Sequence, residues 1–178
     1  GGRGKAFCGG ADVKELSELT AENAGRFVQK IHAVCEAIRK LPAPVVARLH
    51  GAVIGAGLEI AAACDLRVAA EGTRFAMPEV RLAIPSVVEA ALLPRLMGSG
   101  RAAWLVLTGE AIDARRALEW GLIEEIGSDA AVDALILSLV KNDREALRMQ
   151  KQLLQLWEEA PLAASIEKSI ELFGESHR

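Results

Sequence analysis

The chain has 178 residues, of which 51% are hydrophobic and 25% charged, and its formal net charge is −3. This length supports one well-packed core and excludes two large domains. Both signs of charge are mixed along the chain, which argues against a nucleic-acid-binding surface, and no apolar run is long enough to span a membrane. The three cysteines have no metal-binding spacing, so we expect reduced thiols, a cytoplasmic location and no metal site.

The first half of the sequence alternates strand patterns with helical ones. Residues 1–11 have the pattern of a strand end and a turn, and Asp12 can cap a short helix. Thr20 is a suitable N-cap for a longer helix. Strand, turn, helix and strand at this spacing indicate repeated ββα units in an α/β fold. In chain order we expect a helix over residues 21–40, a strand over 45–50, a helix over 58–64, and strands over 66–69 and 74–76.

From residue 87 onward the apolar residues recur at helical spacing. Asp113 and Asp143 are plausible N-caps for two of the helices. We therefore expect an α/β core over residues 1–97, followed by a C-terminal helical subdomain over 98–178. The helices are expected over residues 87–97, 99–108, 113–119, 129–140, 142–158 and 161–173.

Two turns rich in small residues carry the strongest functional signal. Residues 7–12 and 55–59 each run into a helical pattern, and small side chains let backbone N–H groups approach a common point. Two such donors can form an oxyanion hole, which stabilises negative charge on a carbonyl oxygen. Glu59 lies in the second turn and Glu79 follows a short strand. Donors and two acids together favour chemistry next to an activated carbonyl.

Five segments resemble the enoyl-CoA hydratase/isomerase (crotonase) superfamily, in the order in which that family has them. The resemblance implies a crotonase-like spiral of ββα repeats followed by a helical subdomain. Family members carry further strands before the first segment, so we expect the N-terminal strands to be missing from this chain. No cofactor is implied, because CoA is part of the substrate. The segments are KAFCGGADVK (5–14), HGAVIGAGLE (50–59), ACD (63–65), FAMPE (75–79) and GLI (121–123).

The resemblance also implies roles for individual residues. The N–H groups of Ala11 and Ala56 would form the oxyanion hole, and Glu59 and Glu79 would be the catalytic acids. Apolar neighbours predict that Glu59 is partly buried with a raised pKa. The residues expected to contact substrate are Lys5, Gly10, Asp12, Lys14, Gly55 and Gly57.

Residues 84–89 depart from the family pattern, which is rich in glycine at this point. Val87 and Val88 are expected to crowd the acyl tail of the substrate. Glu89 is either a third catalytic acid or a surface charge paired with a basic residue such as Arg95, and the surface role is favoured.

The resemblance implies an enoyl-CoA hydratase that adds water across the 2,3-double bond of an acyl-CoA thioester. An enoyl-CoA isomerase is the alternative, because an isomerase can work with one acid at the position of Glu79. A non-catalytic crotonase-like scaffold is a third reading. Apolar residues beyond residue 150 exceed what one helix can bury, and with the resemblance they predict a homotrimer or a dimer of trimers.

Overall fold

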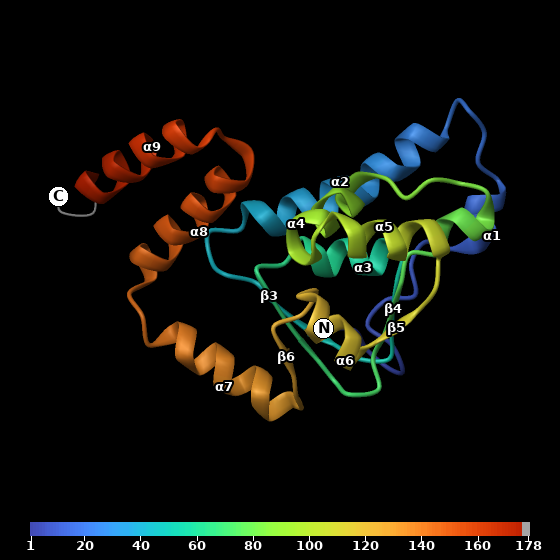
Figure 1. The fold of residues 1–178 in the computed structure, drawn as a ribbon, viewed down its shortest axis with the longest axis horizontal. Helices are drawn as coiled ribbons and strands as arrows, with labels where there is room; N and C mark the ends of the chain where they lie inside the picture. Colours follow the sequence, from blue (N-terminus) through green and yellow to red (C-terminus); the bar gives the residue numbers. More distant parts are fainter. Residues whose placement is uncertain (176–178) are drawn as a thin grey trace.

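Two three-stranded sheets form the centre of the computed structural model, which describes residues 1–175, and helices surround them (Figure 1). One sheet is parallel throughout, whereas the other ends in an antiparallel pair between β4 and β5. The first sheet has the order β1 (Val46–Leu49), β3 (Leu66–Ala69) and β6 (Glu125–Ile126), and the second has the order β2 (Ala52–Ile54), β4 (Arg74–Ala76) and β5 (Ile112–Asp113).

Strands and helices follow one another in ββα order, as the sequence predicts. Strands β1 and β2 lead into α3 (Ala56–Ala62), and β3 and β4 lead into the short 3-10 helix η1 (Glu79–Leu82). The fold is therefore α/β. Strands β3 and β4 coincide with their predicted ranges, and α3 begins two residues before its predicted start.

The first long helix begins later than the sequence predicts. Helix α1 (Val13–Ser17) is capped by Asp12 as expected, but α2 (Ala24–Lys40) has Asn23 at its N-cap position. The prediction of Thr20 as the cap is wrong. The side chain of Asn23 accepts a hydrogen bond from the amide of Thr20 at 2.7 Å, which closes a turn before the helix.

The second half of the described chain is mainly helical. The side chains of Asp113 and Asp143 cap α6 and α8, because they accept hydrogen bonds from amides three residues later. Both predicted caps are confirmed. The elements are η2 (Val88–Leu92), α4 (Leu93–Met97), α5 (Ser99–Thr108), α6 (Ala114–Trp120), α7 (Asp129–Val140), α8 (Arg144–Glu159) and α9 (Leu162–Glu175).

One hydrophobic core joins residues on both sides of position 97. Strands β5 and β6 complete the two sheets, and Leu105 and Leu122 are fully buried in the same cluster as Leu58 and Phe75. Burial of such side chains contributes about 1.5–3 kcal/mol each to stability. This core fixes the positions of the two small-residue turns relative to one another.

Helices α7, α8 and α9 extend to one side of this core (Figure 1). Helix α8 is anchored by Lys151, whose buried ammonium lies 2.8 Å from a carboxylate oxygen of Asp65. The ammonium also donates to the carbonyl oxygens of Ile38 and Ala43, at 3.2 and 3.0 Å. A buried charge needs such partners, since an unpaired one is strongly destabilising. These contacts therefore fix α8 against the core.

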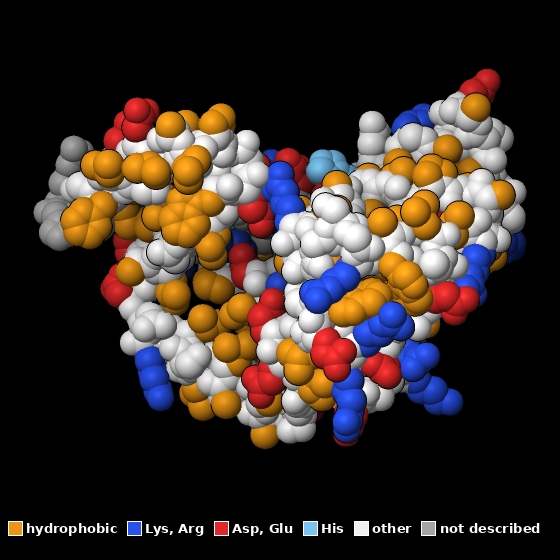
Figure 2. All heavy atoms as spheres, viewed as in Figure 1, with side chains coloured by type: hydrophobic (Ala, Val, Ile, Leu, Met, Phe, Trp, Pro, Cys, Tyr) orange, Lys and Arg blue, Asp and Glu red, His pale blue; other side chains and the backbone are white. Residues whose placement is uncertain are grey.

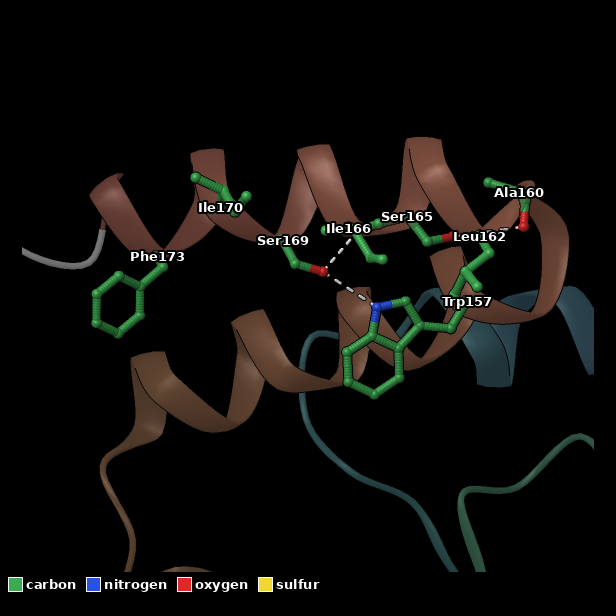
Figure 3. A pocket seen from close by; sticks show the side chains of 8 residues that line it. All are labelled: Trp157, Ala160, Leu162, Ser165, Ile166, Ser169, Ile170 and Phe173. Atoms are coloured by element: carbon green, nitrogen blue, oxygen red, sulfur yellow. Dashed lines mark hydrogen bonds between the residues drawn. The ribbon is translucent and has the colours of Figure 1, made fainter.

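An open apolar groove of about 570 Å³ separates α8 from α9 (Figure 3). Trp157 of α8 lines this groove, and its indole Nε1 donates a hydrogen bond to the hydroxyl of Ser169 of α9 at 3.1 Å. Hydrophobic side chains gather over this part of the surface (Figure 2). Those of α9 that are exposed are Leu162, Ile166, Ile170 and Phe173.

Within residues 1–175 no helix is both long and apolar enough to cross a membrane. The three cysteines, Cys8, Cys35 and Cys64, are free thiols.

Candidate active site

A cleft of about 680 Å³ opens between the two small-residue turns, α2 and η1. Glu59 and Glu79 both line it, together with the backbone of both turns. Most of the remaining lining is apolar, which suits a hydrocarbon chain. These apolar residues are Val13, Leu16, Leu19, Phe27, Val28, Ile31, Ile54, Leu82, Ile84 and Val87.

Backbone pairing brings the two turns together. The amide of Cys8 donates to the carbonyl of Ala52 at 3.1 Å, and the amide of Ile54 donates to the carbonyl of Cys8 at 3.0 Å. Beyond this pairing, the N–H groups of Ala11 and Ala56 donate to no described residue. Both residues line the cleft. Two residues whose backbone donors have no described acceptor therefore line one cleft, and such donors are what an oxyanion hole would use.

Three glycines make this geometry possible. Gly10 has a φ of +97°, and a Cβ there would lie 2.9 Å from the carbonyl oxygen of Ile54. Gly55 has a φ of +53°, and its Cβ would lie 2.6 Å from Oε1 of Glu79. Both lie in the cleft lining, whereas Gly57 does not. A Cβ at Gly57 would lie 2.4 Å from the carbonyl oxygen of Cys8, so this glycine lets α3 pack against the first turn.

Glu59 is a buried acid in the first turn of α3, with 5% of its surface exposed. Its pKa is raised to about 7, first by burial and then by the charges of Glu79 and Glu89. The amide of Ala90 donates to its Oε1 at 3.3 Å, which opposes this shift. Near neutral pH Glu59 can therefore hold or release a proton, which is what general acid–base catalysis needs.

Glu79 is the first residue of η1 and is half-buried. The hydroxyl of Ser86 donates to its Oε2 at 2.9 Å, and this hydrogen bond orients the carboxylate. Gly55 faces the other oxygen, Oε1. Glu79 is thus held by Ser86 in space that the absence of a side chain at Gly55 leaves open. The charge of Glu79 contributes to the raised pKa of Glu59.

Four of the expected substrate-contacting residues lie outside the cleft lining: Gly57, described above, and Lys5, Asp12 and Lys14. Asp12 caps α1, because its carboxylate accepts a hydrogen bond from the amide of Lys14 at 2.8 Å. The side chains of Lys5 and Lys14 are exposed near the first turn. Their contact with CoA phosphates stays a prediction.

Glu89 does not lie at the surface, so the favoured prediction for this residue is wrong. It is buried, and its Oε1 lies 2.7 Å from Nδ1 of His32. Arg95 instead lies 3.7 Å from Glu158 of α8. Val88, which precedes Glu89, has a φ of +41°, and this turns the chain so that Glu89 faces α2. Val88 consequently does not line the cleft, although Val87 does.

Two contacts at the site were not expected from the sequence. Ser86 follows Glu79 by seven residues and donates a hydrogen bond to it. The hydroxyl side chain of Ser86, within the segment 84–89 that departs from the family pattern, is the sequence feature that could have indicated this contact. His32 lies 57 positions before Glu89. No local pattern links these two residues, because only the packing of α2 against η2 brings them together.

Comparison with known proteins places the chain in a family. The sequence profile of the "Enoyl-CoA hydratase/isomerase" family matches residues 1–174. A Bacillus subtilis protein named as an enoyl-CoA hydratase/isomerase is 42% identical over 123 residues, which cover 68% of this chain and 47% of that protein. The short-chain-enoyl-CoA hydratase of Clostridium acetobutylicum is 31% identical over 176 residues, which cover 96% of this chain and 67% of that protein.

The fold comparison agrees. The crystal structure of an enoyl-CoA hydratase from Thermoplasma volcanium superposes with a TM-score of 0.92 at 29% identity, over 97% of this chain and 70% of that one. The chain spans about half the length of several curated relatives that it matches. The profile match, the relatives and the fold together establish that the chain belongs to the enoyl-CoA hydratase/isomerase family.

Proposed function

We propose that the chain binds an acyl-CoA thioester and hydrates its 2,3-double bond, as an enoyl-CoA hydratase. The observation that carries this proposal is the position of Glu59 and Glu79 in one cleft with two backbone N–H groups that donate to no residue among 1–175. The activity of the relatives, as their names state it, supports the same reaction class.

The N–H groups of Ala11 and Ala56 would hold the thioester oxygen. They stabilise the negative charge that develops on this oxygen when water attacks C3. One carboxyl of the Glu59–Glu79 pair would take a proton from the water, and the other would give a proton to C2. Because neighbouring carboxylates disfavour double ionisation, the pair can share one proton near neutral pH.

The acyl chain would lie along the apolar wall of the cleft. Val87 occupies this wall, in a segment where the family is usually rich in glycine, so we expect it to limit the space for the acyl tail. Lys5 and Lys14 would contact the CoA phosphates as exposed point charges. The reaction needs no separate cofactor, because CoA enters with the substrate.

The alternative is an enoyl-CoA isomerase, and the firmly held position of Glu79 supports it. An isomerase moves one proton between two carbons, and Glu79 alone, fixed by Ser86, could do this.

A substrate comparison separates these two reactions. Crotonyl-CoA and a 3-enoyl-CoA would be offered to the protein at equal concentration, and the two rates compared. We expect hydration of crotonyl-CoA to be the faster reaction. Faster conversion of the 3-enoyl-CoA to its 2-enoyl isomer would favour the isomerase, and binding of both without conversion would favour a non-catalytic scaffold.

A further inference from the structure

Glu89 occupies an interior position directly behind the candidate active site. It belongs to η2, which packs against both α2 and α3. Only 7% of its surface is exposed, and it does not line the cleft. A carboxylate in such a place requires an explanation, because burying a charge is costly unless it is paired.

Two side chains of α2 are polar partners of Glu89: the imidazole of His32 and the thiol of Cys35, whose hydrogen bond to Glu89 is one cause of its raised pKa. Nδ1 of His32 lies 2.7 Å from Oε1 of Glu89, and the histidine side chain is 51% exposed. The other oxygen, Oε2, is buried and has no hydrogen-bond partner in the described part of the chain. One end of Glu89 is thus connected to solvent through an imidazole, and the other end is unsatisfied.

Glu59 belongs to α3, which packs against the helix η2 that carries Glu89. The negative charge of Glu89 is one of the causes that raise the pKa of Glu59, and the amide of Ala90, the residue after Glu89, donates to Glu59. His32, Glu89 and Glu59 therefore form a series of titratable groups that runs from the surface of α2 to the acid in the cleft.

The backbone before Glu89 is strained. Val88 has a φ of +41°, a region that β-branched residues rarely adopt. This conformation directs Glu89 inward. Such strain persists only where the surrounding structure enforces it.

The proton balance of the proposed hydration indicates a function for the series His32, Glu89 and Glu59. In the proposed hydration, one carboxyl of the Glu59–Glu79 pair gains a proton from water as the C3–O bond forms, and the other loses a proton to C2. Each turnover therefore leaves Glu59 in the opposite protonation state, and it must exchange one proton before the next. Exchange through the cleft is hindered, because Glu59 is only 5% exposed even without substrate.

We propose that His32 and Glu89 carry one proton between Glu59 and solvent after each turnover, and that this returns Glu59 to its starting protonation state. Both residues act through Glu59 and do not touch the substrate. This proposal rests on the proposed function. If Glu59 has lost a proton, Nδ1 of the protonated imidazole of His32 gives one to Oε1 of Glu89, Glu89 passes one to Glu59, and solvent reprotonates the imidazole. Glu79 releases the proton that it gained from water to solvent through the open cleft, so that the pair returns to its starting state. If Glu59 has gained a proton, the same steps run in reverse.

The groups that face this series are few. Cys35 of α2 faces Glu89 and Glu59, and its pKa is raised to about 12 by burial and then by those charges, so it stays a neutral thiol. Glu79 faces Glu59 from η1. Glu36, one turn after His32, interacts with the imidazole, but its carboxylate pairs with Lys40.

The test compares the first turnover with later ones. His32→Gln removes the titrating ring and keeps a polar side chain, and hydration of crotonyl-CoA would be followed by rapid mixing with enzyme near substrate concentration. We expect a first turnover within about twofold of the wild type, followed by a steady-state rate at least about tenfold lower, because proton return has become limiting. Glu89→Gln should show the same burst, which is a normal first turnover followed by a slow steady-state rate.

Two further measurements separate a proton route from a structural role. In His32→Ala, added imidazole should restore the steady-state rate, because the site of the ring is half-exposed. Glu36→Gln, a change on the same helix outside the series, should show no burst and no response to imidazole.

Equal loss of the first and later turnovers in both variants, without rescue by imidazole, would overturn the proton route while leaving the proposed function intact. Unchanged steady-state rates in the His32 and Glu89 variants would also overturn the proton route. They would mean that Glu59 and Glu79 exchange their proton directly. A wild-type protein without any hydration would overturn the proposed function and the proton route with it.

Discussion

The hydroxyl of Ser86 donates a hydrogen bond of 2.9 Å to Oε2 of Glu79, and this bond fixes one of the two acids that line the cleft. The absence of a side chain at Gly55 leaves room for the other oxygen of the same carboxylate. Glu59, by contrast, is held by burial and by one long hydrogen bond from Ala90. The two acids thus differ in how they are positioned, and each can be disturbed separately.

Ser86→Ala should reduce the turnover rate with little change in substrate affinity. A hydrogen bond to a charged group contributes about 1.5–3 kcal/mol, so the rate should fall about tenfold to a hundredfold if this bond orients Glu79 in the transition state. Steady-state kinetics with crotonyl-CoA would measure this. Ser86→Thr keeps the hydroxyl and is the matched control, which should retain most of the activity. Equal rates for Ser86→Ala and the wild type would show that the bond does not position the acid.

Gly55→Ala should displace Glu79. A Cβ at this position would lie 2.6 Å from Oε1 of Glu79, at a φ of +53° that disfavours alanine. We expect the turnover rate to fall about a hundredfold, in proportion to the misplacement of a catalytic group. Gly100→Ala is the control, because nothing lies within 4 Å of its Cβ position in α5. Gly100→Ala should keep full activity and raise the free energy of unfolding by about 0.5–1 kcal/mol.

Ala56→Pro tests the second backbone donor. Ala56 is the first residue of α3, a position that tolerates proline because its N–H has no partner within the helix. Loss of the donor should lower the turnover rate about 10²–10³-fold. Ala56→Gly keeps the N–H and should stay active. Circular dichroism would confirm that both variants fold, and a fully active, folded Ala56→Pro would exclude this N–H from the oxyanion hole.

The raised pKa of Glu59 predicts how stability depends on pH. The pKa rises from 4.5 to about 7 on folding, so between these values the folded state binds more protons than the unfolded state. The contribution of Glu59 to the free energy of unfolding is therefore fully present below pH 4.5 and is lost as the pH rises through about 7. The total loss is on the order of 3 kcal/mol. Glu59→Gln should remove this loss. Urea midpoints at pH 5 and pH 8 would show a smaller difference for Glu59→Gln than for the wild type, whereas the exposed Glu36→Gln should behave like the wild type.

Local patterns predicted the elements of this fold better than its long-range contacts. Helices α5 and α7 and strands β3 and β4 match their predicted ranges residue for residue, and in the two helices the apolar periodicity accounts for the match. Strands β2, β5 and β6 are two or three residues long, and they exist only through pairing with distant partners. The sequence gives too few residues there for any period to appear.

The same distinction applies to the candidate site. Glu59, Glu79, Ala11 and Ala56 lie together in the cleft as the two turns imply, although their catalytic roles stay predictions. The position of Glu89 could not be predicted, because it depends on the unusual backbone conformation of Val88 and on a partner in α2.

The predicted trimer also stays a prediction, and the exposed apolar face of α9 makes it testable. Ile170 is 68% exposed in the middle of that face, and exposed apolar patches mark interfaces. Light scattering should give three or six times the chain mass of 19.0 kDa. Ile170→Glu should shift the mass toward the monomer, whereas a monomeric wild type at micromolar concentration would refute the trimer.

Hydration of crotonyl-CoA by the wild type, Glu59→Gln and Glu79→Gln tests the central claim most directly. Each substitution keeps the shape of the side chain and removes its ability to exchange a proton. We predict that both variants lose at least about a hundredfold in turnover rate while retaining their affinity for acyl-CoA, since general acid–base catalysis contributes about 10²–10⁴-fold. Retention of hydration by either folded variant would contradict the assignment of Glu59 and Glu79 as a catalytic pair.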